Sequence, residues 1–283
     1  EDKLNLKGDY SENMTATQCE DVVSNWKKKF YDVYGKAPVA FVFDDGWDAY
    51  GTWTFNPNFP EGFKKVDAMA REMGVGIGAW LGPVGGYGAS GEYRRGYWRG
   101  RGGMQLSNPA YYDYFVKCSS DMIDKYDFRF FKYDGISAQF SAVGPDMTDA
   151  GLENCEAIIS IENDVRKKRK DIFYNTTVGT WASPFWFHVS DAVWRQEGDF
   201  GTIGVGDDRE QWITYRDRLV HQNFIDRSPI CPINTLMTHG VILTRFGAVS
   251  KTMNYDGIVR EMRCAFGCGS SMVELYTDYK LLD

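Results

Sequence analysis

Apolar and polar residues follow one another in blocks that predict short buried strands separated by amphipathic helices. Residues 39–43 and 75–81 contain no charged side chain, which is typical of parallel strands that are buried on both faces. Further strands are expected at 129–133, 172–175, 189–194, 230–234 and 272–275. Helical spacing of apolar residues predicts helices over 16–34, 61–73, 109–125, 152–170, 209–223 and 257–266. A glycine-, tyrosine- and arginine-rich stretch at 84–104 is expected to be a long loop.

Seven or eight strands alternating with helices predict an α/β fold, specifically a (β/α)8 TIM barrel. The alternative is a doubly wound sheet, but the sequence lacks the glycine fingerprint of Rossmann folds. The length of 283 residues suits one barrel, since barrels commonly need about 250. We therefore expect a single barrel domain over 1–283, with 1–37 as an N-terminal lead-in helix segment.

The amino-acid composition bears on whether the protein binds nucleic acid, a membrane, a metal or a sugar. The chain has 32 Lys and Arg against 39 Asp and Glu, a net charge of −7, which argues against a nucleic-acid partner. No apolar run approaches the roughly 18 residues of a membrane span, so no membrane partner is expected. Six cysteines in this length do not form a disulfide framework, and Cys264 and Cys268 lack the partners of a zinc site. The 9 Trp, 17 Tyr and 18 Phe are compatible with sugar binding.

Carboxylates cluster where the predicted strands end. Asp44 and Asp45 follow the first strand, and Asp134 follows the strand at 129–133. Asp191 lies within the strand expected at 189–194, and Glu197 and Asp199 follow that strand. In a (β/α)8 barrel the active site gathers at the carboxyl ends of the strands. These positions are therefore candidates for the paired carboxylates of general acid–base and nucleophilic chemistry.

Lys132 lies two residues before Asp134, so both side chains point to the same face of the strand. A buried ammonium beside a carboxylate favours the ionised carboxylate that a nucleophile requires. The alternative is a structural Lys–Asp pair that fills the interior of the barrel.

Four motifs, in order, resemble one family of enzymes. They are residues 43–47 (FDDGW), 58–64 (NFPEGFK) with 74–80, 131–135 (FKYDG) and 194–199 (WRQEGD). Together they resemble the retaining α-galactosidases and α-N-acetylgalactosaminidases of clan D, glycoside hydrolase families 27 and 36. The resemblance is clear from about residue 38 to residue 199 and extends beyond that only in layout.

The resemblance implies specific roles for these residues. Asp134 corresponds to the nucleophile and Asp199 to the general acid/base. The residues expected to bind the sugar are Asp44, Asp45, Trp47, Trp80, Lys132, Asn175, Trp181 and Arg195. For Trp47 and Trp80, packing inside the barrel remains the alternative. The arginine-rich stretch at 93–103 is expected to form a lid or an aglycone-binding loop.

The match to the two families is uneven. Family 27 usually has a cysteine just after the nucleophile, whereas Gly135 and Ile136 follow Asp134 here. Family 36 places the acid/base in a Ser–Asp pair, so Asp191 after Ser190 is the alternative to Asp199. The loop at 175–186 leaves the choice between galactose and N-acetylgalactosamine open.

The resemblance implies a retaining exo-hydrolase of terminal α-linked galactose or N-acetylgalactosamine, acting on an oligosaccharide or glycoconjugate with no cofactor or metal. Alternatives are a catalytically silent carbohydrate-binding barrel and a transglycosylating, raffinose-synthase-like relative. Relatives usually carry a β-sandwich after the barrel, so the chain is expected to be a catalytic core without it. Many relatives are secreted, periplasmic or lysosomal.

Overall fold

The computed structural model describes residues 10–11, 13–136, 147–180, 183–229, 231–243, 249, 254–274 and 278. The chain forms two compact units, Glu1–Gly179 and Thr180–Asp283. Among the described residues, no helix is long and apolar enough to cross a membrane. All six cysteines are free, as expected from their number and spacing.

The first unit is built on four parallel strands. They are β1 Ala40–Phe43, β4 Gly76–Leu81, β5 Phe128–Tyr133 and β6 Phe173–Thr176, and they pair in that order. Every residue of β4 is buried, as its apolar sequence predicts. Gly78 is required there, because a Cβ would lie 2.4 Å from the carbonyl oxygen of Phe130 on the neighbouring strand.

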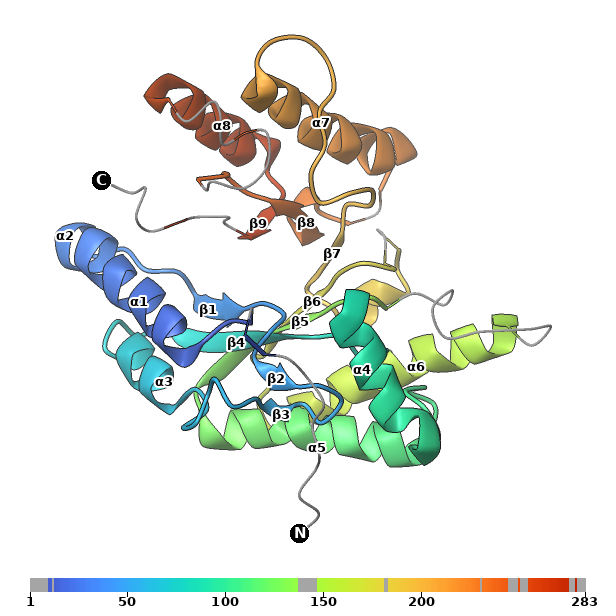
Figure 1. Ribbon diagram of the computed structural model, residues 1–283. Coiled ribbons are helices and arrows are strands. Elements are labelled where there is room, and N and C mark those ends of the chain that lie inside the picture. Colours follow the sequence, from blue (N-terminus) through green and yellow to red (C-terminus); the bar gives the residue numbers. More distant parts are fainter. Residues whose placement is uncertain are drawn as a thin grey trace. The chain divides into compact units, whose positions relative to one another are not determined.

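Helices follow the strands of this unit (Figure 1). The helical elements are α1 Ala16–Trp26, η1 Lys27–Tyr31, α2 Asp32–Tyr34, α3 Lys64–Arg71, α4 Gly88–Trp98, η2 Arg99–Arg101, α5 Pro109–Lys125 and α6 Met147–Arg166. Local sequence sets two of their starts. Thr15 and Gln18 form a capping box at α1, while the side chain of Asn108 caps α5 immediately before Pro109.

A small antiparallel hairpin follows β1. Its strands are β2 Asp48–Ala49 and β3 Thr54–Phe55, and the sequence pattern did not predict it. Trp53, just before β3, has a positive φ of 47°, which is rare for a bulky residue. Its indole N–H donates to the hydroxyl of Tyr111 at 3.1 Å, and the ring is buried. Tertiary packing therefore holds this turn.

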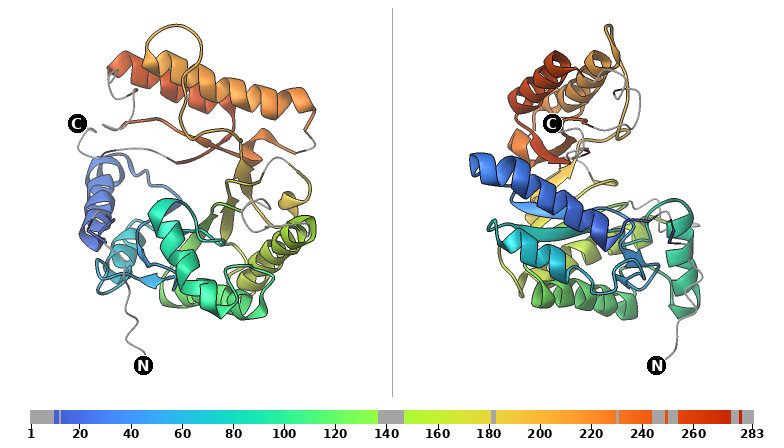
Figure 2. Two further views of the ribbon diagram at one scale, coloured as in Figure 1. Left: turned by 45° about the vertical axis from the view of Figure 1, so that its right-hand side comes forward. Right: turned by 60° about the vertical axis from the view of Figure 1, so that its left-hand side comes forward.

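The second unit contains three parallel strands, β7 Ala192–Trp194, β8 Leu236–His239 and β9 Ser271–Glu274. Its helices are α7 Asp208–Asn223, α8 Tyr255–Cys268, η4 Trp186–His188, η5 Ile225–Arg227 and η6 Ile233–Thr235. Helices α7 and α8 lie side by side, as both views of Figure 2 show.

A buried ion pair between Arg209 of α7 and Glu261 of α8 joins these two helices. Trp212 of α7 also donates its indole N–H to Glu261, at 2.9 Å. Burial raises the pKa of the Glu261 carboxyl, against the opposing effect of Arg209. The Glu261 carboxylate is thus held both by an ion pair and by a hydrogen bond.

The alternation of parallel strands and helices confirms the α/β fold. A closed eight-stranded barrel is not seen in the described part of the chain, where unit 1 has four parallel strands and unit 2 has three. The strand expected at 189–194 is shorter, because the backbone N–H groups of Val189 and Ser190 both donate to the carbonyl of Trp186, so β7 begins only at Ala192.

Two local predictions were wrong. The expected loop at 84–104 contains helix α4, although its glycines disfavour a helix. Burial of Arg94 and Trp98 from this helix explains why packing outweighs propensity. The strand expected at 230–234 is displaced to β8 at Leu236–His239. Pro232 lacks the N–H that a strand ladder needs and instead precedes η6.

Candidate active site

Asp134 lies immediately after β5, at the carboxyl end of the unit 1 sheet. Its carboxylate is 8% exposed and accepts four hydrogen bonds. The donors are the indole N–H of Trp80 at 2.9 Å, the hydroxyl of Tyr87 at 3.0 Å, and the hydroxyl of Thr177 and the backbone N–H of Gly135, each at 2.7 Å. Four donors from three sides of the site fix the direction of the carboxylate. The arrangement suits a nucleophile.

Neighbouring strands supply the frame for this carboxylate. The backbone N–H of Asp134 donates to the carbonyl of Leu81 at the end of β4, and the N–H of Thr177 donates to the carbonyl of Tyr133. The strand ladder therefore continues past β5 on both sides. Because Trp80 and Thr177 come from these two adjacent strands, the sheet itself brings them to Asp134.

Lys132 Nζ donates to Oδ2 of Asp44 at 2.9 Å, a partner that the sequence did not predict. The Asp44 side chain is 54% exposed, whereas that of Lys132 is 10% exposed. The backbone N–H of Asp45 donates to Asp44 Oδ1 at 2.8 Å. Asp44 thus presents an oriented, partly exposed carboxylate after β1.

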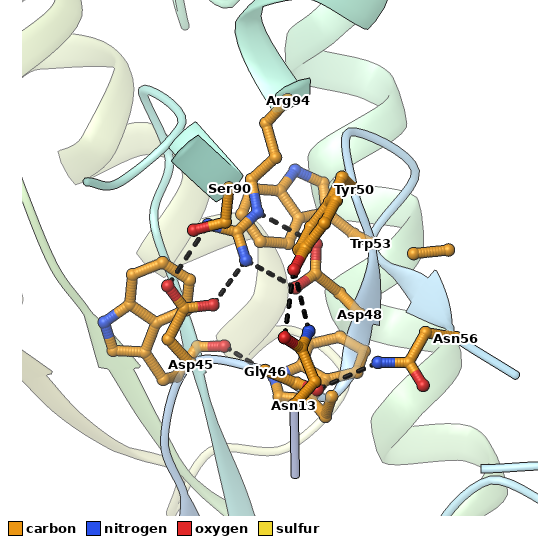
Figure 3. Close-up of polar contacts among 12 residues, drawn as sticks. Asn13, Asp45, Gly46, Asp48, Tyr50, Trp53, Asn56, Ser90 and Arg94 are labelled. Carbon is orange, nitrogen blue, oxygen red and sulfur yellow. Dashed lines mark hydrogen bonds and ion pairs between the residues drawn. The ribbon is translucent and has the colours of Figure 1, made fainter. Parts of the chain in front are cut away.

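Asp45 is held by Arg94, which reaches it from α4 (Figure 3). The guanidinium of Arg94 also forms an ion pair with Asp48, with Nε 3.0 Å from Oδ2 and Nη2 2.6 Å from Oδ1. Asp48 and Arg94 have no exposed surface, while one third of the Asp45 side chain is exposed. Burial alone would lower the pKa of Arg94, but its pairs with Asp48 and Asp45 raise it.

The two tryptophans expected at the sugar are almost fully buried. Trp47 is 0% and Trp80 1% exposed. The indole N–H of Trp47 donates to the carbonyl of Trp80 at 2.9 Å, and its ring packs against Phe55 and Phe63. Trp80 therefore contacts Asp134 through its N–H, and Trp47 supports Trp80 from the first-strand loop.

Asn175 of β6 lies beside Lys132 of β5 in the strand register. Its side chain is fully buried, and within the described part of the chain neither its amide nitrogen nor its amide oxygen has a hydrogen-bond partner. A buried amide without partners is costly in a native protein unless a ligand or water satisfies it. Trp181, also expected at the site, lies outside the described residues.

In unit 2, Arg195 follows β7 and is fully buried. Its guanidinium donates to three backbone carbonyls of the next loop, those of Gln196 at 2.8 Å, Gly198 at 3.0 Å and Asp199 at 3.1 Å. It also lies 3.3 Å from His239 Nδ1. Burial lowers the pKa of Arg195 from its ordinary value. Arg195 therefore shapes the loop that carries Asp199.

This loop has an unusual backbone. Gln196 and Glu197 both have positive φ, 74° and 64°, a conformation that costs free energy in residues other than glycine and clusters at functional sites. The carbonyl of Glu197 accepts from the indole of Trp194, and that of Gly198 accepts from the hydroxyl of Tyr215, both at 3.2 Å. Hydrogen bonds from Trp194, Arg195 and Tyr215 thus hold the backbone of this loop in its conformation.

Asp199 and Asp191 are both exposed in unit 2. Asp199 ends the loop that Arg195 holds, whereas Asp191 precedes β7. No group of His, Cys, Asp and Glu among the described residues is arranged to hold a metal ion.

Sequence reasoning missed four residues that build the unit 1 site. Asp48 and Arg94 form the buried ion pair, and Tyr87 and Thr177 donate to Asp134. The stretch at 93–103, which contains Arg94, was expected instead to form a lid or an aglycone-binding loop. The position of Thr177 just after β6 was an available signal, because residues at strand ends gather at one edge of the sheet.

No protein-family model matches the sequence, and no curated protein matches it. Solved α-galactosidases are nevertheless similar in fold. A variant of the GH36 α-galactosidase AgaA from Geobacillus stearothermophilus, in complex with stachyose, gives a TM-score of 0.63 at 13% identity, over 95% of this chain and 37% of that chain. The α-galactosidase from Lactobacillus brevis gives 0.61 at 13% identity, over 94% and 36%.

TtGalA, the α-galactosidase from Thermus thermophilus in complex with p-nitrophenyl α-D-galactopyranoside, gives a TM-score of 0.54 at 15% identity, over 94% of this chain and 57% of that chain. The chain therefore spans between 36% and 57% of the length of these proteins. The resemblance first seen in four sequence motifs is thus matched by a resemblance in fold.

Proposed function

We propose, from this fold similarity and from the setting of Asp134, that the chain is a glycoside hydrolase that removes terminal α-linked galactose or N-acetylgalactosamine with retention. The observation that carries the proposal is the buried Asp134 carboxylate, which is oriented by donors from Trp80, Tyr87 and Thr177. The partly exposed carboxylates of Asp44 and Asp45 are in the same unit, each with its own cation. The complete fold in this proposal is a closed (β/α)8 barrel.

Two carboxylates carry out the reaction in this proposal. Asp134 attacks the anomeric carbon, and the glycosidic bond breaks while Asp199 donates a proton to the leaving oxygen. The resulting glycosyl ester on Asp134 is then hydrolysed, because Asp199 takes a proton from the incoming water. Each step inverts the anomeric carbon, so the product keeps the configuration of the substrate. Retaining enzymes of this type hold the two carboxyl groups about 5–5.5 Å apart.

The other residues bind the sugar. Ionised carboxylates only accept hydrogen bonds, so Asp44 and Asp45 would accept hydrogen bonds from hydroxyl groups of the substrate. Lys132 would donate a hydrogen bond, and the amide of Asn175, which has no hydrogen-bond partner among the described residues, would satisfy one polar group of the ligand. Arg195 would contribute through the loop that ends at Asp199. The solved AgaA variants carry raffinose and stachyose, which supports an oligosaccharide as the substrate.

The test is a panel of aryl α-glycosides with the product anomers followed by NMR. We expect release of the α-anomer first from α-galactosides or α-N-acetylgalactosaminides. Asp134→Asn should lower turnover by several orders of magnitude, whereas Asp113→Asn, a control at an exposed position of α5, should leave it unchanged. Wild-type activity in Asp134→Asn, or first release of the β-anomer, would overturn the proposal.

The acid/base is tested separately. Azide should restore activity to Asp199→Ala, because it replaces the water that the missing base would activate, and it should form a glycosyl azide. Asp191→Ala should keep its activity without azide. The reverse pattern would assign the role to Asp191.

A further inference from the structure

Resting on the proposed function, we propose that Arg94 is a positioning residue. It fixes the carboxylate of Asp45 for a substrate hydroxyl and couples it, through Trp80, to Asp134. Figure 3 shows the arrangement, in which the side chain of Arg94 enters from α4 and its guanidinium lies between Asp45 and Asp48.

All three nitrogens of the Arg94 guanidinium donate hydrogen bonds within the protein. Nε and Nη2 bond to Asp48, Nη1 and Nη2 bond to Asp45, and Nη1 also donates to the carbonyl of Gly85 at 3.1 Å. With no exposed surface, Arg94 has no donor directed at solvent. It therefore acts on a ligand through Asp45, which is partly exposed, rather than by direct contact.

Asp48 completes the charge balance. It has no exposed surface and cannot touch a substrate. A buried arginine without a buried counter-ion would be strongly disfavoured, so Asp48 holds the guanidinium in place. The remaining N–H groups are then available to Asp45. Asp48 thus holds the Arg94 cation in place, and Arg94 in turn orients Asp45, the carboxylate that faces the ligand.

Aromatic rings fix the plane of the guanidinium. Its carbon lies 4.9 Å from the ring centre of Trp80, 5.2 Å from that of Trp53 and 5.3 Å from that of Tyr50. Trp80 is also the residue that donates to Asp134 Oδ2. One arginine therefore contacts both the hydroxyl-binding carboxylate and the indole that orients the nucleophile.

A lysine would not replace this arginine. Its ammonium carries a similar charge, but it lacks the planar fork that bonds two carboxylates at once and the flat surface that stacks on aromatic rings. Arg94→Lys should therefore preserve the positive charge but no longer fix the orientation of the Asp45 carboxylate. The matched control is Arg71→Lys, an exposed arginine at the end of α3 whose Nε also donates to a carboxylate, that of Asp67.

The experiment compares kcat and KM of the wild type, Arg94→Lys, Asp48→Asn and Arg71→Lys. The substrates are p-nitrophenyl α-galactoside and its 4-deoxy and 6-deoxy counterparts. On the parent substrate, Arg94→Lys should lower kcat/KM by about tenfold or more through a higher KM, the effect of a weakened hydrogen bond to a charged group. On the analogue that lacks the hydroxyl bound by Asp45, the same substitution should change kcat/KM by less than about threefold. Asp48→Asn should follow the pattern of Arg94→Lys, and Arg71→Lys should match the wild type throughout.

An equal loss on all three substrates would overturn the proposal, because a merely structural role would not depend on one hydroxyl. A crystal structure of Arg94→Lys provides a readout that needs no activity. The Asp45 carboxylate should leave its wild-type position, and an unmoved carboxylate would also overturn the proposal. A wild type without α-glycosidase activity, together with a displaced Asp45 in the variant, would refute the proposed function but not the positioning role.

Discussion

Replacing Trp80 with phenylalanine separates the hydrogen bond to Asp134 from the aromatic bulk at the same position. The indole N–H of Trp80 donates to Asp134 Oδ2 at 2.9 Å in a fully buried setting. A hydrogen bond to a charged group contributes about 1.5–3 kcal/mol. If that contribution orients the nucleophile, its loss corresponds to about a 10- to 150-fold fall in kcat/KM.

Trp98→Phe is the matched control. Trp98 is also buried, and its indole N–H donates to the carbonyl of Gly51 at 2.6 Å, so both substitutions remove one buried indole hydrogen bond and a similar volume. Urea unfolding should show a comparable loss of stability, about 2–4 kcal/mol, in the two variants. Only Trp80→Phe should lose activity on an aryl α-galactoside beyond about threefold.

Two results would refute the reasoning. Wild-type kcat/KM in Trp80→Phe, with the expected loss of stability, would mean that the bond to Asp134 does not affect the reaction. An equal loss of activity in Trp98→Phe would mean that general destabilisation, not the orientation of Asp134, explains the effect. Activity is best measured well below the unfolding temperature of the least stable variant.

Three further predictions follow from other parts of the molecule. Arg195→Met should speed amide hydrogen exchange at residues 196–199, because the guanidinium holds the carbonyls of Gln196, Gly198 and Asp199, and unchanged exchange would contradict this role. Burial raises the pKa of the Cys19 and Cys118 thiols to about 12 and about 11, so iodoacetamide at pH 8 should spare both in the folded protein, as peptide mapping would show. Burial acts to raise the pKa of Asp127, but bonds from Arg129 and Arg169 outweigh it and lower the pKa. This stabilisation is present above the ordinary carboxyl pKa near 4 and is lost as the pH falls through the lowered value. Asp127→Asn should therefore cost about 1–2 kcal/mol in urea unfolding at pH 7 and less at pH 3, and an equal cost at both pH values would contradict the ion pairs.

Much of the local structure could be read from the chain. The apolar run at 75–81 became β4, and the Asn108–Pro109 start fixed α5, because burial on both faces and helix capping are set by neighbouring residues. The position of Asp134 after a strand was predicted in the same way. Each of these features depends only on residues that are neighbours along the chain.

The contacts around Arg94 could not be read in this way. It lies 46 residues from Asp48 and 49 from Asp45 along the chain, in a glycine-rich stretch whose local preference is for a loop. Packing overrides that preference, since burying Arg94 between two carboxylates and three aromatic rings requires α4 to form. The left-handed pair at Gln196 and Glu197 is likewise fixed by distant partners such as Tyr215.

The sequence by itself therefore determined the alternation of strands and helices and the carboxylates at the strand ends. Hydrophobic periodicity and helix capping depend on residues that are close together in the sequence, so both can be recognised without the tertiary structure. The tertiary structure decided which cation serves which carboxylate, with Lys132 on Asp44 and Arg94 on Asp45. It also decided that Trp80 donates to Asp134. Such pairings depend on which buried groups meet after folding, because a charge or an N–H removed from water must find a partner wherever the fold provides one.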